Sequence, residues 1–134
     1  METEEVQDEI IKEMAKLKSQ MEKYGYLIRL GRGLAPMDEK LKTADNLIGG
    51  CQSRVWLNAE LKEGKLRIAA DSDALIVKGI IALLLRVLNN RTPQEISGAD
   101  LYFLRETGLE SRLSPVRANG VLTIVSRIKD LSRR

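Results

Sequence analysis

The chain has 134 residues, of which 43% are hydrophobic and 31% are charged, and its net charge at neutral pH is +3. This length and composition are typical of one soluble globular domain, which we assign to residues 1–134. The small net charge and the few aromatic residues (one Trp, three Tyr and one Phe) give no basic surface interleaved with stacking rings, so we expect no nucleic-acid partner.

Two residue types limit the available chemistry, because the chain has no histidine and a single cysteine, Cys51. Without histidine, neither a Ser-His-Asp triad nor a Cys-His pair can form. One sulfur ligand with only carboxylates beside it does not suit zinc, so we expect no metal site. A single cysteine cannot form an internal disulfide, which agrees with a reducing compartment.

The sequence carries no pattern that is typical of targeting or membrane segments. The N-terminus is acidic, whereas a signal peptide begins with basic residues and an apolar run. The longest apolar run, residues 74–88, is interrupted by Lys78 and Arg86 and is shorter than the roughly 20 residues that span a bilayer. We therefore expect a cytoplasmic protein with no membrane partner.

The first third of the chain predicts two helices followed by an irregular segment. Apolar side chains recur at steps of three or four over residues 4–20 and form one stripe: Val6, Ile10, Met14, Leu17 and Met21. A second helix is predicted over residues 22–32, with Gly31 and Gly33 at its end. Residues 35–50 then form the longest irregular segment, and they lead directly to Cys51.

A β-hairpin is predicted after this segment. From Ser53 onward the side chains alternate between an inward face (Val55, Leu57, Ala59 and Leu61) and an outward face (Arg54, Trp56, Asn58 and Glu60). Residues 53–61 and 65–70 are the expected strands, with a turn over residues 62–64. Because an isolated hairpin is only marginally stable, we expect helices or a further strand to cover it.

Residues 73–88 predict a central helix, because apolar residues occupy nearly every side of it. Asp71 or Ser72 is the expected cap at its N-terminus. Gly79 lowers helix propensity, which a close neighbouring element would explain. The charged groups of Lys78 and Arg86 need either oppositely charged partners or contact with solvent, which their long side chains can reach. For Lys78, the candidate partners are Asp71 and Asp73, which Arg117 could bind instead.

Three shorter patterns complete the chain. Thr92-Pro93-Gln94-Glu95 is a capping box with proline at the first helical position. Another short helix is expected over residues 101–107, before Gly108, and a last one from Ser114-Pro115 to about residue 131. Together these elements predict an α+β fold in which a small antiparallel sheet is packed against several helices.

Cys51 is the one strong nucleophile of the chain, and its context favours two interpretations equally. Gly49 and Gly50 allow a sharp turn before it, and the positive charge of Arg54 favours a thiolate. Most free cysteines, however, are small buried side chains without a chemical role. Trp56 has a similar pair of interpretations, as ordinary core under a helix or as an anchor for a partner.

Several segments together resemble the SufE family, whose members accept sulfur from cysteine desulfurases during iron–sulfur cluster assembly. The resemblance rests on the stretch from Asn46 to Trp56, which contains Gly50-Cys51-Gln52-Ser53. It extends to further segments in the same order: Glu22-Lys23-Tyr24, Leu30-Gly31, Asp71-Ser72-Asp73-Ala74, Ile76-Val77-Lys78-Gly79, Thr92-Pro93-Gln94-Glu95-Ile96, and Leu113-Ser114-Pro115-Val116-Arg117 with Gly120. Residues 34–42 follow the family pattern least well.

The resemblance implies a curved antiparallel sheet flanked by helices, similar to the iron–sulfur scaffold proteins, and it implies that Cys51 is the sulfur acceptor. The implied partners are a cysteine desulfurase, which holds its own pyridoxal phosphate, and a downstream scaffold. The chain would then be an accessory persulfide carrier with no cofactor of its own. Gly49 and Gly50 are expected to act as the hinge of the loop, and Gln52, Arg54 and Trp56 are candidates for contact with a partner.

Two alternatives from other functional classes stay open at the level of sequence. The first is a docking activator of a desulfurase for which Cys51 is dispensable. The second is a redox sensor with a single reactive cysteine. The oligomeric state is also open, including a weak homodimer.

Overall fold

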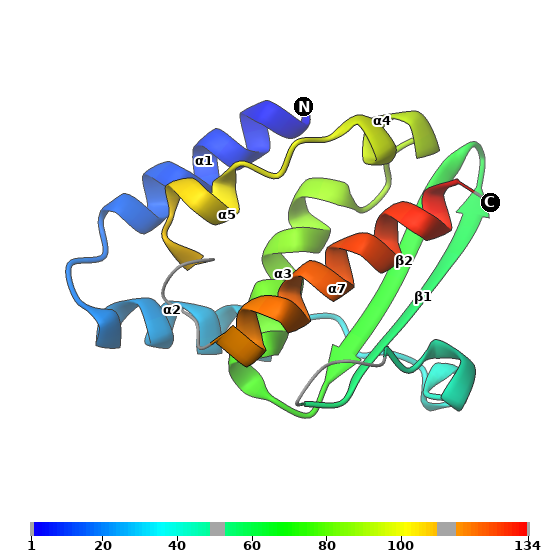
Figure 1. The fold of residues 1–134 in the computed structure, drawn as a ribbon, viewed down its shortest axis with the longest axis horizontal. Coiled ribbons are helices and arrows are strands. Elements are labelled where there is room, and N and C mark those ends of the chain that lie inside the picture. The colour runs from blue at the N-terminus through cyan, green and yellow to red at the C-terminus, as the bar shows by residue number, and fades with distance from the viewer. Residues whose placement is uncertain (1, 49–52, 110–114, 134) are drawn as a thin grey trace.

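A computed structural model describes residues 2–48, 53–109 and 115–133, with only the backbone described for residues 115–119 (Figure 1). The central predictions for Gly49, Gly50, Cys51 and Gln52 therefore lie outside the described residues. The elements, in chain order, are the helices α1 (Thr3–Ala15) and α2 (Gln20–Arg32), the 3-10 turns η1 (Glu39–Leu41) and η2 (Ala44–Asn46), the strands β1 (Val55–Lys62) and β2 (Lys65–Ser72), and the helices α3 (Leu75–Leu88), α4 (Pro93–Gly98), α5 (Phe103–Glu106) and α7 (Pro115–Ser132). The α+β prediction is confirmed.

Helix α3 is the centre of the fold, as its apolar sequence predicts. It contacts α1, α2, α7 and strand β2 (Figure 1). Seven of its residues are buried: Gly79, Ile80, Ile81, Leu83, Leu84, Val87 and Leu88. Because apolar side chains on several sides of α3 are covered at once, this helix joins the hairpin to the helical layers in a single core.

The close approach predicted at Gly79 is confirmed, and the neighbour is α2. A Cβ atom on Gly79 would lie 2.7 Å from the carbonyl carbon of Leu27. On the facing helix, a Cβ atom on Gly31 would lie 2.7 Å from the carbonyl oxygen of Leu75. Gly31 was expected to end α2, but it lies inside the helix and is buried, and Gly33 is the C-terminal cap. The two glycines therefore allow the helix backbones to touch.

The predicted antiparallel hairpin is confirmed, with Val55 of β1 opposite Ser72 of β2 and Lys62 opposite Lys65. Its strands differ slightly from the expected bounds, because β1 begins at Val55 and includes Lys62, and β2 continues to Ser72. Its turn contains Glu63 and Gly64, both with positive φ, which is the geometry of a tight two-residue hairpin turn. The expected inward face is buried at Val55 and Leu57, but Leu61 is 60% exposed. Near the turn, the backbone of Asn90 and Arg91 forms hydrogen bonds with the backbone of Leu66 in β2.

The expected helix over residues 4–20 ends earlier, at Ala15. A new helix begins after Ser19, whose side chain forms a capping box with Glu22. The break shifts the helical phase, so Met21 is 82% exposed instead of continuing the apolar stripe. The sequence Ser-x-x-Glu at residues 19–22 is the capping signal that predicts this break.

The start of α3 also differs from expectation. Ala74 is its N-cap residue, and neither Asp71 nor Ser72 caps the helix itself. The Ser72 hydroxyl instead accepts a hydrogen bond from the Ala74 amide at 3.2 Å. The capping box at Thr92, by contrast, is confirmed. Within the described ranges, no helix combines the length and apolar character that crossing a membrane requires.

Candidate functional site at the base of the Cys51 segment

The chain that leads to Cys51, residues 35–48, is here called the arm. Its side chains Met37 and Ile48 are each only 5% exposed, so it is attached to the body near both ends. The Ile48 amide donates a hydrogen bond to the Val55 carbonyl at 2.8 Å, and Leu47 pairs with Trp56. The arm therefore ends beside the first residues of β1.

The chain that follows residues 49–52 is fixed through the backbone of Arg54. Its amide donates to the Asp73 carboxylate at 3.0 Å, and its carbonyl accepts the Asp73 amide at 3.2 Å. The Ser72 hydroxyl donates to the same carbonyl at 2.8 Å. Three hydrogen bonds therefore fix the chain at Arg54, two positions after residue 52.

Four side chains meet beside this place, and we call Lys42, Trp56, Asp71 and Lys78 the Asp71 cluster. Lys42 Nζ lies 2.8 Å from Asp71 Oδ2, and Lys78 Nζ lies 3.5 Å from Asp71 Oδ1. The Lys42 ammonium also lies 5.5 Å from the centroid of the Trp56 ring. Trp56 and Asp71 face each other across the hairpin, so the cluster joins the arm, both strands and α3.

The charges of the cluster shift one another's ionisation. Burial by itself raises the pKa of the Asp71 carboxyl, but hydrogen bonds from Lys42 and the Ser72 amide, with the charges of Lys78 and Lys42, outweigh it and hold this pKa below its usual value. Hydrogen bonds to Asp71 and Glu39 raise the pKa of Lys42. Lys42 therefore lies between two carboxylates, those of Asp71 and Glu39, so the two lysines of this region are balanced by two anions.

The structure places the predicted site residues in different roles. The Arg54 side chain is exposed, although its backbone is fixed. Trp56 is half-buried under Lys42 and is not one of the buried core residues, so its interpretation as ordinary core is wrong. Lys78 binds Asp71, which was one of its candidate partners. Asp73 binds the Arg54 backbone, and the side chain of Arg117 lies outside the described residues.

Sequence reasoning missed two contacts of the arm, those of Lys42 and of Arg127. Arg127 of α7 donates from NH2 to the Asp45 carbonyl at 3.2 Å. Both contacts join an irregular segment to residues far along the chain, at separations for which periodicity gives no signal. Only the pairing of the hairpin and the position of α7, known from the structure, bring these groups together.

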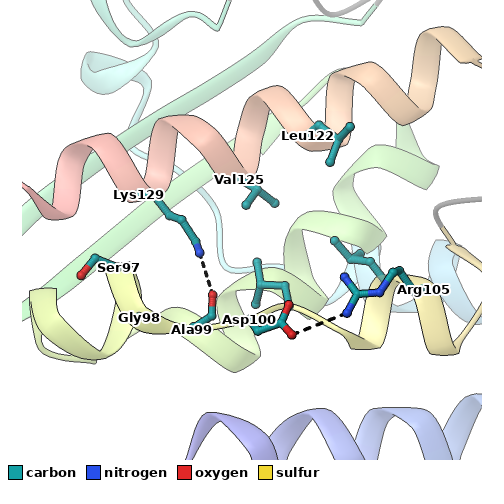
Figure 2. A pocket seen from close by; sticks show the side chains of 10 residues that line it. Ser97, Gly98, Ala99, Asp100, Arg105, Leu122, Val125 and Lys129 are labelled. Carbon is teal, nitrogen blue, oxygen red and sulfur yellow. Dashed lines mark hydrogen bonds and ion pairs between the residues drawn. The ribbon is translucent and has the colours of Figure 1, made fainter.

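A groove lies away from the Asp71 cluster, between α7 and the connection from α4 to α5 (Figure 2). This groove has a volume of about 340 Å³. Lys129 Nζ donates to the Ala99 carbonyl at 2.6 Å, and Arg105 lies 3.5 Å from the Asp100 carboxylate. These charged groups bind the walls of the groove itself, and we assign the groove no ligand.

Comparisons with known proteins agree on one family. Residues 8–132 match the family model named SufE, which is described as an Fe-S metabolism associated domain. An uncharacterized SufE-like protein of Synechocystis is 44% identical over 102 residues, which cover 76% of this chain. The matched region spans 64% of that relative's length. The solution structure of a hypothetical protein from Thermus thermophilus has a TM-score of 0.78, covers 96% of this chain and 93% of its own, and is 20% identical, so it supports the fold alone.

Proposed function

Because this chain belongs to the SufE family, we propose that it accepts sulfur from a cysteine desulfurase on Cys51 and passes it on for iron–sulfur cluster assembly. One observation carries the proposal. The only cysteine of the chain lies in Gly50-Cys51-Gln52-Ser53, inside the region that matches a family associated with Fe–S metabolism. No other residue of the chain combines a strong nucleophile with this context.

The transfer step is a thiol–persulfide exchange. The Cys51 thiolate attacks the outer sulfur of a persulfide on the desulfurase, a new S–S bond forms on Cys51, and the desulfurase cysteine leaves as a thiolate. One sulfur atom moves with its proton, and no external oxidant or reductant is needed. The same exchange, with a scaffold or another acceptor as the attacking group, then releases the sulfur from Cys51.

One exposed charge near the Cys51 segment suits this chemistry. A thiolate is the reactive form of cysteine, and nearby cations favour it. Arg54, three residues after Cys51 in the sequence, has an exposed side chain that can supply such a cation. Lys42 and Lys78 are balanced by the carboxylates of Asp71 and Glu39, so we do not count them toward this effect.

The surface beside the segment suits contact with another protein. Leu47 is 40% exposed shortly before residues 49–52, and Arg54 is exposed after them. With Gln52 and the half-buried Trp56, these side chains are the candidates for contact with the desulfurase. The chain then needs no cofactor of its own, since the pyridoxal phosphate belongs to the desulfurase, and the exchange is expected to take place in the cytoplasm.

Intact-mass measurement tests the proposal directly. The protein is incubated with a cysteine desulfurase, pyridoxal phosphate and L-cysteine, and its mass is recorded without reductant. We expect a gain of about 32 Da, one sulfur atom, that is absent in Cys51→Ser. An unchanged mass with faster desulfurase turnover would contradict sulfur transfer and support a docking activator. If neither changes, a fast reaction of Cys51 with peroxide would support a redox sensor instead.

A further inference from the structure

We propose that Lys42 is a positioning residue for the Cys51 segment, because its ammonium group joins the arm to the Asp71 carboxylate and the Trp56 ring. The role of this contact in sulfur transfer rests on the proposed function. Its effect on the exposure and reactivity of the Cys51 thiol does not, because these properties can be measured without a desulfurase.

The geometry makes Lys42 a bridge and not only a surface charge. Its Nζ atom lies 2.8 Å from Asp71 Oδ2 on β2 and 5.5 Å from the centroid of Trp56 on β1. These two residues are paired across the hairpin, so a single ammonium contacts both strands. Glu39, 3.1 Å from the same nitrogen, orients it from within the arm. The contact thus fixes the middle of the arm to the sheet.

The partly buried position of the Lys42–Asp71 pair makes the attraction between its charges stronger than in an exposed ion pair. The side chains of Lys42 and Asp71 are only 20% and 16% exposed, so solvent screens their attraction less than it does in exposed pairs. The second oxygen of Asp71 is held by Lys78 from α3. The Ser72 amide donates to the same oxygen at 2.8 Å, so the orientation of the carboxylate does not depend on Lys42 alone.

Loss of Lys42 is expected to loosen the arm without unfolding the protein. Met37 and Ile48 remain buried on either side of it, and Arg127 still holds the Asp45 carbonyl. Between these points, η1 and η2 are short 3-10 turns with no buried residue. Local opening is most frequent where buried apolar contacts are few, so the effect should stay within the arm and the adjoining Cys51 segment.

The test compares Lys42→Gln with Lys40→Gln, which removes the same charge from an exposed position two residues away. Two quantities are measured on each protein: the alkylation rate of Cys51 with iodoacetamide across pH, and the fluorescence emission of Trp56, the only tryptophan. We expect Lys42→Gln to change the alkylation rate about threefold or more, because local opening becomes more frequent, and to shift the emission. Lys40→Gln should change neither, and Lys42→Arg should restore both.

Salt provides a second measurement that needs no variant. Raising the salt concentration should change the alkylation rate of the wild-type protein in the same direction as Lys42→Gln, but by less than that substitution does because the pair is partly buried, and the rate of the variant should change less than that of the wild type. Unchanged alkylation and emission in Lys42→Gln would overturn the positioning role, and so would equal changes in Lys40→Gln. If the alkylation differs as expected but wild-type protein gains no sulfur from a desulfurase, the proposed function fails and the positioning role stands.

Discussion

Helix α3 carries two cations about 12 Å apart along its axis, and each belongs to a charged cluster. Lys78 belongs to the Asp71 cluster at the base of the Cys51 segment. Arg86, near the other end of the helix, binds Glu13 at 2.7 Å and Glu9 at 3.2 Å, both on α1. The two clusters use the same chemistry on the same helix, but they join different kinds of structure.

The Arg86 cluster (Glu9, Glu13, Tyr26 and Arg86) joins three helices that are already packed. The guanidinium group forms hydrogen bonds to both oxygens of Glu13, and the Tyr26 hydroxyl donates to the same carboxylate at 2.9 Å. Beneath these contacts, α1 buries an apolar stripe of Val6, Ile10 and Met14 in the core. The ion pairs therefore add to an interface that the hydrophobic effect maintains without them.

The Asp71 cluster joins the hairpin to an arm that has no regular structure beyond two short 3-10 turns. Fewer buried groups hold this segment, so a single ion pair decides more of its position. The consequence of losing a salt bridge therefore depends on what else fixes its partners. We therefore expect loss of the ion pairs of Arg86 to affect mainly stability, and loss of the Lys42–Asp71 pair to affect mainly the position of the arm.

The largest loss of stability is expected from a substitution that displaces α3 itself, since both clusters depend on the position of this helix. In Gly79→Ala, the new methyl group would overlap the backbone of Leu27, and backbone cannot move aside as a flexible side chain can. We expect the free energy of unfolding to fall by about 3 kcal/mol, measured by urea denaturation.

Gly25→Ala is the matched control for this change, because Gly25 also lies inside a helix. Its nearest neighbour beyond the helix backbone is the end of the Arg29 side chain, 4.0 Å away. Here alanine should raise the free energy of unfolding by about 0.5–1 kcal/mol through its better helix propensity. Equal effects of the two substitutions would contradict the contact between the α2 and α3 backbones.

The sequence alone predicts the parts of the fold that depend on local periodicity. The alternation after Ser53 predicts the buried face of the hairpin, and the continuous apolar surface of residues 75–88 predicts a central helix. Gly79 is an informative case, because its cost in helix propensity indicates a close neighbour. The identity of that neighbour, α2, is beyond local reasoning, since it depends on how the helices pack.

The candidate site was predictable in part. The motif around Cys51 indicates where the chemistry lies, and the charge of Lys78 indicates a nearby carboxylate. Lys42 gave no signal, since it lies in an irregular segment 29 positions before its partner Asp71. Leu61 shows a second limit, because the alternation of a strand indicates which side chains share a face but does not show where the elements that cover this face end. Met21 shows a third, because a break between two helices shifts the helical phase.

The next largest losses of stability are expected when either of the two carboxylates that bind the cations of α3 is removed. Asp71→Asn leaves Lys42 and Lys78 close together without their shared anion, and we expect the free energy of unfolding to fall by about 2 kcal/mol. Glu13→Gln removes the partner of Arg86 at a more exposed place, and we expect a loss of less than about 1 kcal/mol. Urea denaturation measures both.

Cysteine reactivity separates the two variants more sharply than stability does. Asp71→Asn should change the alkylation rate of Cys51, whereas Glu13→Gln should leave it at the wild-type value, because the Arg86 cluster touches neither the arm nor β1 among the contacts described for it. A change of equal size in both variants would mean that α3 transmits the loss of either cluster, and the contrast between the two ends of the helix would be lost.

The smallest expected effect is a shift in the pKa of one side chain, that of Tyr26 in the Arg86 cluster. Burial, followed by the hydrogen bond and the charge of Glu13, raises the pKa of Tyr26 from 10.0 to about 12. A raised pKa in the folded state stabilises the fold below pH 10, and this contribution is lost as the pH rises toward 12. In Glu13→Gln the pKa of Tyr26 should fall while staying above 10.0, because burial remains.

Ultraviolet titration of tyrosinate measures the pKa of Tyr26 in a Tyr102→Phe background, since a hydrogen bond to Asp8 also raises the pKa of Tyr102 to about 12. Circular dichroism at each pH shows whether the helices persist. In Asp71→Asn, the Tyr26 titration should not move, and a shift there would show that the two clusters are coupled through α3.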